Sequence, residues 1–202
     1  MLNRATFTRR GALATMAGGV AVAFTSPAFA LTEDQARKLV DRLTADVMSV
    51  INSGKSEPAM YKDFEAIFAK YADVPIIAQS TLGVAWRSAS ASEQAAYVAA
   101  FRGYMARKYG RRFREFIGSE IKVTGARKEK SFYVVDSTVK LQGSAPFEVN
   151  WLVSDKSGKD LMFNLIIEGI NMMVSEREEI GLMLDKNGGN VSKLIEQLKT
   201  AG

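Results

Sequence analysis

The spacing of hydrophobic residues predicts helices at both ends of the chain and strands between them. From Thr32 onward, apolar residues recur at every third or fourth position, which is typical of one face of a helix. Thr32 with Gln35, and Ser90 with Glu93, have the spacing of a capping box, so helices are predicted to begin at these two places. The N-terminal helices are predicted to run from Thr32, from Pro58, from Val74 to about Trp86, and from Ser90 to near Gly118.

Beyond Gly118 the apolar positions alternate, which is typical of β-strands with one buried face. Gly143 with Pro146, and then residues 155–158, provide turn-forming positions between the later runs. Because these connections are short, we expect neighbouring strands to be antiparallel and to form a meander. The four predicted strands are 121–126, 132–141, 147–153 and 161–167.

The segment DLMFNLIIEGINMMVSER, residues 160–177, joins the last strand to the C-terminal helices. Leu161, Phe163, Leu165 and Ile167 share one parity and are predicted to face one side of the sheet. Gly169 then allows a sharp turn. Ser175 with Glu178 predicts a capping box, and Asn190 is a good N-cap. Two closing helices are therefore predicted, 176–186 and 191–199. Helices, then a four-stranded antiparallel sheet, then two helices make the predicted fold class α+β.

Residues 1–30 have the three parts of an export signal. Arg4, Arg9 and Arg10 precede an uncharged apolar stretch, 11–24, and Ala28-Phe29-Ala30 fits an A-x-A cleavage site. The apolar stretch is too short for a good membrane span, which favours a cleaved signal over an anchor. The paired arginines are typical of a twin-arginine signal, and a general secretory signal stays open. Either route predicts export and a single mature domain, 31–202.

Composition narrows the possible functions. The net charge is +5, but the predicted signal carries three arginines and no acid, which leaves +2 and gives little reason to expect nucleic-acid binding. The chain has no cysteine and no histidine, so disulfides, most zinc sites, cysteine nucleophiles and Ser-His-Asp triads are excluded. No glycine-rich phosphate loop occurs. We therefore predict no catalytic residue, no metal site and no cofactor.

Several motifs, taken together, resemble the MlaC (toluene-tolerance) family. They are Tyr71-Ala72-Asp73 before a helix with Leu82-Gly83, Ser92-Glu93-Gln94 leading to Phe101 and Tyr104, and the Glu168-Gly169 turn followed by Arg177. Their order and spacing span essentially the whole mature chain. Two residues depart from the family pattern: Asn164 stands where we expect aspartate, and Asn171 where we expect serine.

The resemblance implies a periplasmic phospholipid carrier. It implies one bound glycerophospholipid, with acyl chains in a hydrophobic cavity between the sheet and the helices and the headgroup near the surface. The implied partners are an outer-membrane lipoprotein complex and an inner-membrane ABC transporter with a membrane-tethered lipid-binding subunit. Such a pathway maintains the lipid asymmetry of the outer membrane. The phospholipid is then cargo rather than a cofactor, and ATP is used by the transporter.

The resemblance makes apolar residues of the strands and helices candidates for the cavity wall, with ordinary core packing as the alternative for each. The cavity candidates are Phe101, Tyr104, Val135, Phe147, Val149, Trp151, Phe163, Leu165, Ile167 and Met172. Cations crowd the second half of the long helix, where a solvated face is the alternative to docking on lipid headgroups or acidic partners. The docking candidates are Arg107, Arg111, Arg112 and Arg114.

Two other functions stay open. A periplasmic chaperone or adaptor would bind hydrophobic protein segments in an accessible groove and would not retain lipid. A small hydrolase or isomerase would need a convergent pair of titratable groups, for which the sequence offers only Glu168 with a lysine or tyrosine neighbour. For Glu168 we expect a structural hydrogen bond to the next turn rather than the role of a general base.

Overall fold

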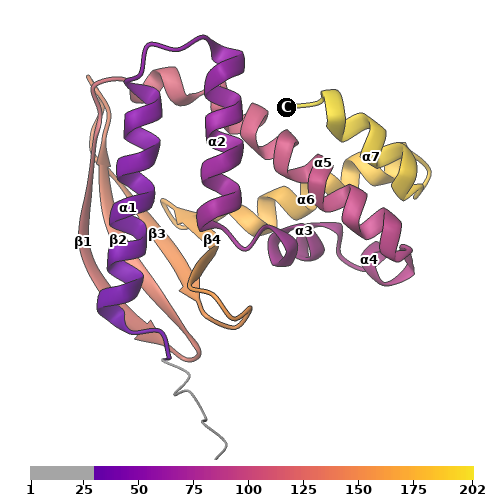
Figure 1. Ribbon diagram of the computed structural model, residues 1–202, viewed down its shortest axis with the longest axis horizontal. Coiled ribbons are helices and arrows are strands. Elements are labelled where there is room, and N and C mark those ends of the chain that lie inside the picture. Colours follow the sequence, from indigo (N-terminus) through magenta and orange to yellow (C-terminus); the bar gives the residue numbers. More distant parts are fainter. Residues whose placement is uncertain (1–29) are drawn as a thin grey trace, which may run out of the picture.

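Helix α1 lies over the sheet at the left of Figure 1, and helices α3 to α7 form a group at the right. Helix α2 lies between α1 and this group. The computed structural model describes residues 30–202, apart from the side chains of Phe113 and Arg114. The predicted signal, 1–30, lies outside the described residues except for Ala30. The helices are α1 Glu33–Ile51, α2 Glu57–Tyr71, α3 Val74–Leu82, α4 Ala85–Ser88, α5 Ala91–Gly110, the 3-10 helix η1 Phe113–Phe116, α6 Met172–Lys186 and α7 Val191–Thr200.

The described residues form one antiparallel meander with the strand order β1-β2-β3-β4-β5. The strands are β1 Glu120–Glu129, β2 Phe132–Lys140, β3 Phe147–Ser154, β4 Leu161–Ile167 and β5 Ile170–Asn171. The α+β class is confirmed, but the prediction of four strands is wrong. Glu168 and Gly169 form a two-residue turn with positive φ angles of 49° and 79°, which returns the chain for two more paired residues.

The capping boxes at Thr32 and Ser90 are confirmed. In the first, the Thr32 hydroxyl accepts from the Gln35 N–H at 3.3 Å, and the Gln35 side chain accepts from the Thr32 N–H at 2.9 Å. Helix α1 then places its apolar stripe, including the buried Leu39 and Leu43, toward the sheet. This arrangement makes α1 one wall of the space behind the sheet.

The prediction that alternate residues of β4 face the same side of the sheet is confirmed only for the second half of the strand. Leu165 lies opposite Trp151, as expected, but the register shifts between Leu152 and Val153. Met162 therefore lies opposite Val153 and is buried, although its parity in the sequence is opposite to that of Leu165. Phe163 packs edge-on against the Phe132 ring, with 5.5 Å between ring centroids.

Two predicted helices end earlier than expected, both at glycines. The helix predicted to reach about Trp86 stops at Gly83, whose φ of 62° and ψ of −129° favour glycine. A Cβ on Gly83 would also lie 3.2 Å from the guanidinium of Arg177. The helix predicted to reach Gly118 ends at Gly110, where a Cβ would lie 2.5 Å from the ring of Tyr61. The 3-10 helix η1 then leads into β1.

The start of α6 was also predicted wrongly. Helix α6 begins at Met172, with Asn171 as its N-cap, and the Ser175–Glu178 box is not its start. Ser175 instead lies inside the helix and donates from its hydroxyl to the Asn171 carbonyl at 3.3 Å. The other closing helix begins as predicted, because Asn190 accepts from the Lys193 N–H at 2.9 Å.

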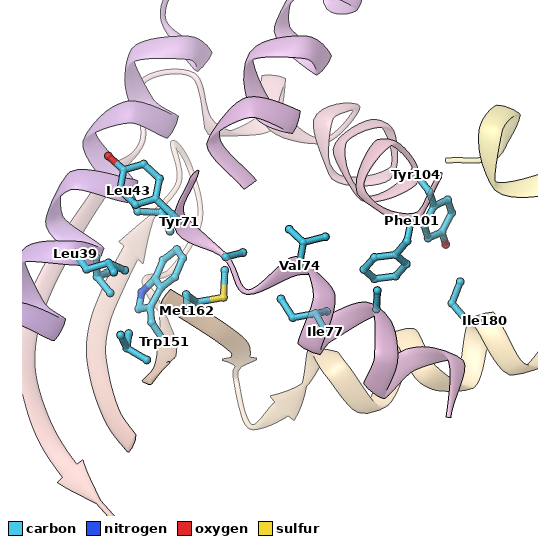
Figure 2. Packing of buried hydrophobic residues seen from close by; sticks show 14 of the residues in the cluster. Leu39, Leu43, Tyr71, Val74, Ile77, Phe101, Tyr104, Trp151, Met162 and Ile180 are labelled. Carbon is cyan, nitrogen blue, oxygen red and sulfur yellow. The ribbon is translucent and has the colours of Figure 1, made fainter. Parts of the chain in front are cut away.

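The buried residues occupy two adjoining regions of one core. Beside the sheet lie Leu39, Leu43, Trp151 and Met162, whereas Phe101, Tyr104 and Ile180 pack among the helices (Figure 2). A backbone hydrogen bond joins the helices to the edge of the sheet where the two regions meet: the Asp73 N–H donates to the Met162 carbonyl at 2.8 Å. None of the helices between residues 30 and 202 combines the length and the hydrophobicity that a membrane span needs.

Candidate functional site

A cavity of about 700 Å³ lies between the inner face of the sheet and the helices. Its wall is formed by α1 and α2, by the last turns of α5 with η1, by the strands, and by the segment from the end of β4 into α6. No residue of α7 contributes to the described wall, because α7 packs on the outer side of α5. Of the two closing helices, only α6 therefore encloses the cavity.

The wall beside the sheet is apolar although it contains a tryptophan. The Trp151 indole N–H donates to the Ser137 hydroxyl at 2.8 Å, and that hydroxyl donates to the Val149 carbonyl at 3.0 Å. The polar atom of the indole is thus satisfied within the sheet, so the ring offers an apolar surface beside Met162 and Tyr71 (Figure 2). Unbranched thioether side chains repack easily, and four of them line the wall: Met105, Met162, Met172 and Met173.

Most of the predicted cavity residues do lie on this wall. Those lining it are Phe147, Val149, Trp151, Phe163, Leu165, Ile167 and Met172. Phe101, Tyr104 and Val135 do not line it; all three are at most 1% exposed and pack in the core. The face of α5 that reaches the cavity carries Met105, Ala106 and Tyr109 instead. Whether the lining residues contact a ligand stays a prediction.

Sequence reasoning missed the contribution of the first two helices to the wall. Leu43 and Val47 of α1 line the cavity, and so does a stripe of α2 that contains Phe64, Ile67, Phe68 and Tyr71. Their helical spacing predicted an inward face, and that signal is correct. It did not distinguish a face that borders empty space from one that is packed against the sheet, because both are apolar.

One wall of the cavity carries a buried carboxylate. Glu176, 2% exposed, lines the cavity from α6 and accepts hydrogen bonds from the Lys108 ammonium at 2.7 and 2.9 Å and from the Tyr109 hydroxyl. Lys108 also donates to Glu179 at 2.5 Å, and the Tyr104 hydroxyl donates to Glu179 at 2.6 Å. The network joins α5 to α6 and satisfies each buried charge in it.

The network shifts the pKa of several of its members. Burial raises the pKa of the Tyr104 and Tyr109 hydroxyls, and the neighbouring carboxylates raise it further. Burial alone would lower the pKa of Lys108, but its bonds to Glu176 and Glu179 outweigh this effect and the pKa is raised. Burial likewise raises the pKa of Glu179, but the bonds from Lys108 and Tyr104 bring it below its usual value. Lys108 and Glu179 are therefore both charged in the neutral range.

The predicted docking arginines have different surroundings. Arg107 donates from Nε to the Ala201 carbonyl at 2.9 Å and from Nη2 to the Leu198 carbonyl, so it caps the end of α7. Arg111 is exposed. Arg112 lies at the cavity and is 3.6 Å from a Glu115 carboxylate oxygen. The side chain of Arg114 lies outside the described residues. Docking by these residues stays a prediction, and Arg107 already has a structural role.

The polar groups at the cavity are arranged for structure rather than for proton transfer. Glu168 accepts from the backbone N–H of Glu148 on the neighbouring strand, and its own N–H donates to the Glu148 carbonyl at 3.1 Å. The expectation of a structural hydrogen bond for Glu168 is thus confirmed, although the partner is a strand and not the next turn. Ser175 donates to a backbone carbonyl. Among residues 30–202, no cluster of acidic, histidine or cysteine side chains could hold a metal ion.

An α+β fold built around a large apolar cavity defines a binding protein for an apolar molecule. Residues 41–200 match the family model described as MlaC protein, and the chain belongs to the MlaC family. The same fold occurs in a phospholipid-binding protein from Ralstonia solanacearum, whose structure was solved in complex with a phospholipid. The two structures superpose with a TM-score of 0.69 at 19% sequence identity, over 81% of this chain and 94% of that one.

Proposed function

We propose that this protein is a carrier that binds one glycerophospholipid, with the acyl chains in the cavity and the headgroup near the surface. The observation that carries this proposal is the cavity of about 700 Å³, whose wall is mainly apolar and whose buried polar side chains already have hydrogen-bond partners. Membership of the MlaC family and the shared fold with a phospholipid-binding protein support it. The lipid is cargo, and neither a cofactor nor catalysis is proposed.

The energetics of acyl-chain burial favour an exchanging carrier. Two acyl chains of ordinary length contain about 30 methylenes, whose removal from water is worth roughly 25 kcal/mol at about 0.8 kcal/mol each. A bilayer shelters the same chains equally well, so a cavity needs only to match the membrane, and a much better cavity would not release its cargo. The methionines of the wall suit this requirement because they adapt to chains of different length.

The size of the cavity fits this cargo. A water molecule occupies about 30 Å³ in the liquid, and a methylene is of similar size, so a cavity of about 700 Å³ has room for some tens of such groups. That is on the order of the methylenes in the two acyl chains of a phospholipid.

The wider route is proposed from family membership. In it, the protein works in the periplasm after export and exchanges phospholipid with an outer-membrane lipoprotein complex and with an inner-membrane ABC transporter that has a membrane-tethered lipid-binding subunit. Such exchange maintains the lipid asymmetry of the outer membrane. The family match over residues 41–200 and the pattern of an export signal in residues 1–30 support this route.

Native mass spectrometry of the exported protein, purified without detergent, tests the carrier function. We expect a mass excess of one glycerophospholipid per chain, identified by extraction and fragmentation. Protein stripped of lipid should regain the same excess after incubation with phospholipid vesicles. Lipid-free protein that takes no lipid from vesicles would contradict the proposal and favour the chaperone or adaptor, which would instead bind unfolded hydrophobic segments.

A further inference from the structure

The start of the described chain is tied to a distant turn of the sheet. The backbone N–H of Leu31 donates a hydrogen bond to Oδ2 of Asp155, with 2.9 Å between nitrogen and oxygen. Asp155 directly follows β3, and its own carbonyl accepts from the Gly158 N–H at 2.8 Å, which fixes the turn between β3 and β4. The position of the Leu31 nitrogen is therefore set by the folded sheet.

The side chain of Leu31 is anchored as well. Leu31 is 6% exposed and belongs to the main apolar cluster, together with Ala36. It precedes the N-cap Thr32, and Ala36 is the fourth helical residue, so the two occupy the positions of a hydrophobic staple. Ala30, in contrast, is exposed. Among residues 30–202, Leu31 is the first buried residue, and the A-x-A pattern predicts the same residue to be the first after signal cleavage.

The carboxylate of Asp155 has unused capacity. An ionised carboxylate offers about four acceptor positions, and a backbone amide can fill only one of them. Among the described residues, the Leu31 N–H is the hydrogen-bond donor that Asp155 has, and no ion pair to Asp155 is found. Lys156 and Lys159 of the same turn are exposed and do not pair with it. The site therefore has an anion without a cation beside the Leu31 nitrogen.

We infer that cleavage after Ala30 turns this contact into an ion pair between the new α-ammonium group of Leu31 and the carboxylate of Asp155. Hydrolysis by a signal peptidase adds water across the Ala30–Leu31 bond, leaving a carboxylate on Ala30 and an amine on Leu31. A free α-amine is mostly protonated at neutral pH, with a pKa of about 7.7–8.0. Its three N–H donors and its charge match the unused capacity of Asp155.

The ion pair makes removal of the signal a stabilising step in maturation. In the precursor, a neutral amide N–H donates to the carboxylate of Asp155; in the mature chain, an ammonium group donates from the same place, so attraction between opposite charges is added to the hydrogen bond. The bond also connects the start of α1 to the β3–β4 turn, and α1 forms part of the cavity wall. This inference rests on the predicted cleavage and does not depend on the nature of the cargo.

The test compares two exported backgrounds expressed from the full chain. The first is the wild type, whose intact mass should correspond to residues 31–202. The second carries one serine inserted between Ala30 and Leu31; cleavage after Ala30 then leaves Leu31 with a neutral amide N–H that can still reach Asp155. Asp155→Asn, made in each background, keeps an oxygen acceptor and removes its charge. Asp160→Asn, at the other end of the same turn, is the matched control and is also made in each background.

We expect Asp155→Asn to lower Tm by roughly 2–4 °C in the normally processed protein. In the protein with the inserted serine, the same substitution should change Tm by less than about 1 °C, and Asp160→Asn should have the same effect in both backgrounds. An equal effect of Asp155→Asn in the two backgrounds would overturn the inference. A mature mass that does not begin at Leu31 would overturn it as well, whatever lipid the protein carries.

Discussion

Asn164 and Asn171, where the resemblance to the family led us to expect aspartate and serine, are hydrogen-bonded to each other. Nδ2 of Asn164 donates to Oδ1 of Asn171 at 3.0 Å, and the same Oδ1 caps α6 by accepting from the Val174 N–H at 3.2 Å. Oδ1 of Asn164 accepts from the Met173 N–H at 3.1 Å. The two positions are therefore one structural feature, since each contributes an amide to the same hydrogen bond.

Restoring one expected residue should destabilise the protein, and restoring both should not. Asn164→Asp removes the donor to Asn171 and places two acceptor oxygens together in a buried site, which should cost about 1 kcal/mol. In Asn164→Asp/Asn171→Ser, the serine hydroxyl can donate to the aspartate and still cap α6. Urea unfolding of the single and double variants measures the coupling. Additive free-energy changes would show that the two sites are independent.

Filling the cavity from the sheet should reduce lipid binding without unfolding the protein. Ile167 lines the cavity, so Ile167→Trp should direct the larger ring into empty space and occupy volume that the acyl chains need. We expect the lipid-bound fraction after incubation with vesicles to fall several-fold, measured by native mass spectrometry. Circular dichroism should show an unchanged fold, because the added atoms enter a cavity rather than a packed core.

Ile166→Trp is the matched control for this variant. Ile166 is the neighbouring residue of β4, has the opposite parity and is absent from the cavity wall. Its replacement adds the same volume to the other face of the sheet and should leave lipid loading close to that of the wild type. Equal loss of lipid in both variants would mean that the strand is disturbed generally and that the cavity is not the site.

The sequence predicted the elements well where a local rule determines the structure. Alternation assigned Phe147, Val149 and Trp151 to one face of β3, and the structure places all three on the cavity wall. Alternation failed at Met162, because a register shift between Leu152 and Val153 turns that side chain to the buried face, and nothing in the local sequence indicates such a shift. The short strand β5 was missed because it has two residues, which are too few to show an alternating pattern.

The rest of the site depends on packing between distant segments. Phe101 and Tyr104 have the spacing of an inward-facing stripe, but the face they occupy is buried among the other helices, and the cavity meets α5 one turn later at Met105 and Tyr109. Gly110, the last residue of that helix, likewise packs against the ring of Tyr61, 49 residues away in sequence. Helical periodicity predicts which face of a helix is apolar, but it does not predict which other segment packs against that face.

Removing the cation beside Glu176 should strongly destabilise the fold. Lys108→Met would leave the carboxylate of Glu176, whose side chain is 3% exposed, without its ionic partner. Such a loss typically costs about 3–5 kcal/mol. The double variant Lys108→Met/Glu176→Gln should recover part of that loss, because it buries no unpaired charge. Chemical unfolding at pH 7 measures both. A loss below about 1 kcal/mol for Lys108→Met would show that the network contributes little.

Lys38→Met removes an exposed ion pair whose nitrogen–oxygen distance equals that between Lys108 and Glu176, and it serves as the comparison. Lys38 lies 2.7 Å from Asp34 one helical turn earlier, but both side chains are largely exposed. Its removal should change the free energy of unfolding by no more than about 0.5 kcal/mol, since solvent screens such pairs. The contrast between the two lysines separates the effect of burial from that of pairing itself.

Glu179 should make stability depend on pH at the acidic end. Because its pKa is lower in the folded protein than the usual value of 4.5, its contribution is fully present above about that pH and is lost as the pH falls through the folded-state value. The difference in the free energy of unfolding between the wild type and Glu179→Gln should therefore stay constant between about pH 6 and pH 8. It should shrink as the pH falls below about 4.5, as followed by urea unfolding. A difference that persists unchanged into acid would mean that the carboxylate charge of Glu179 is not what Lys108 and Tyr104 stabilise.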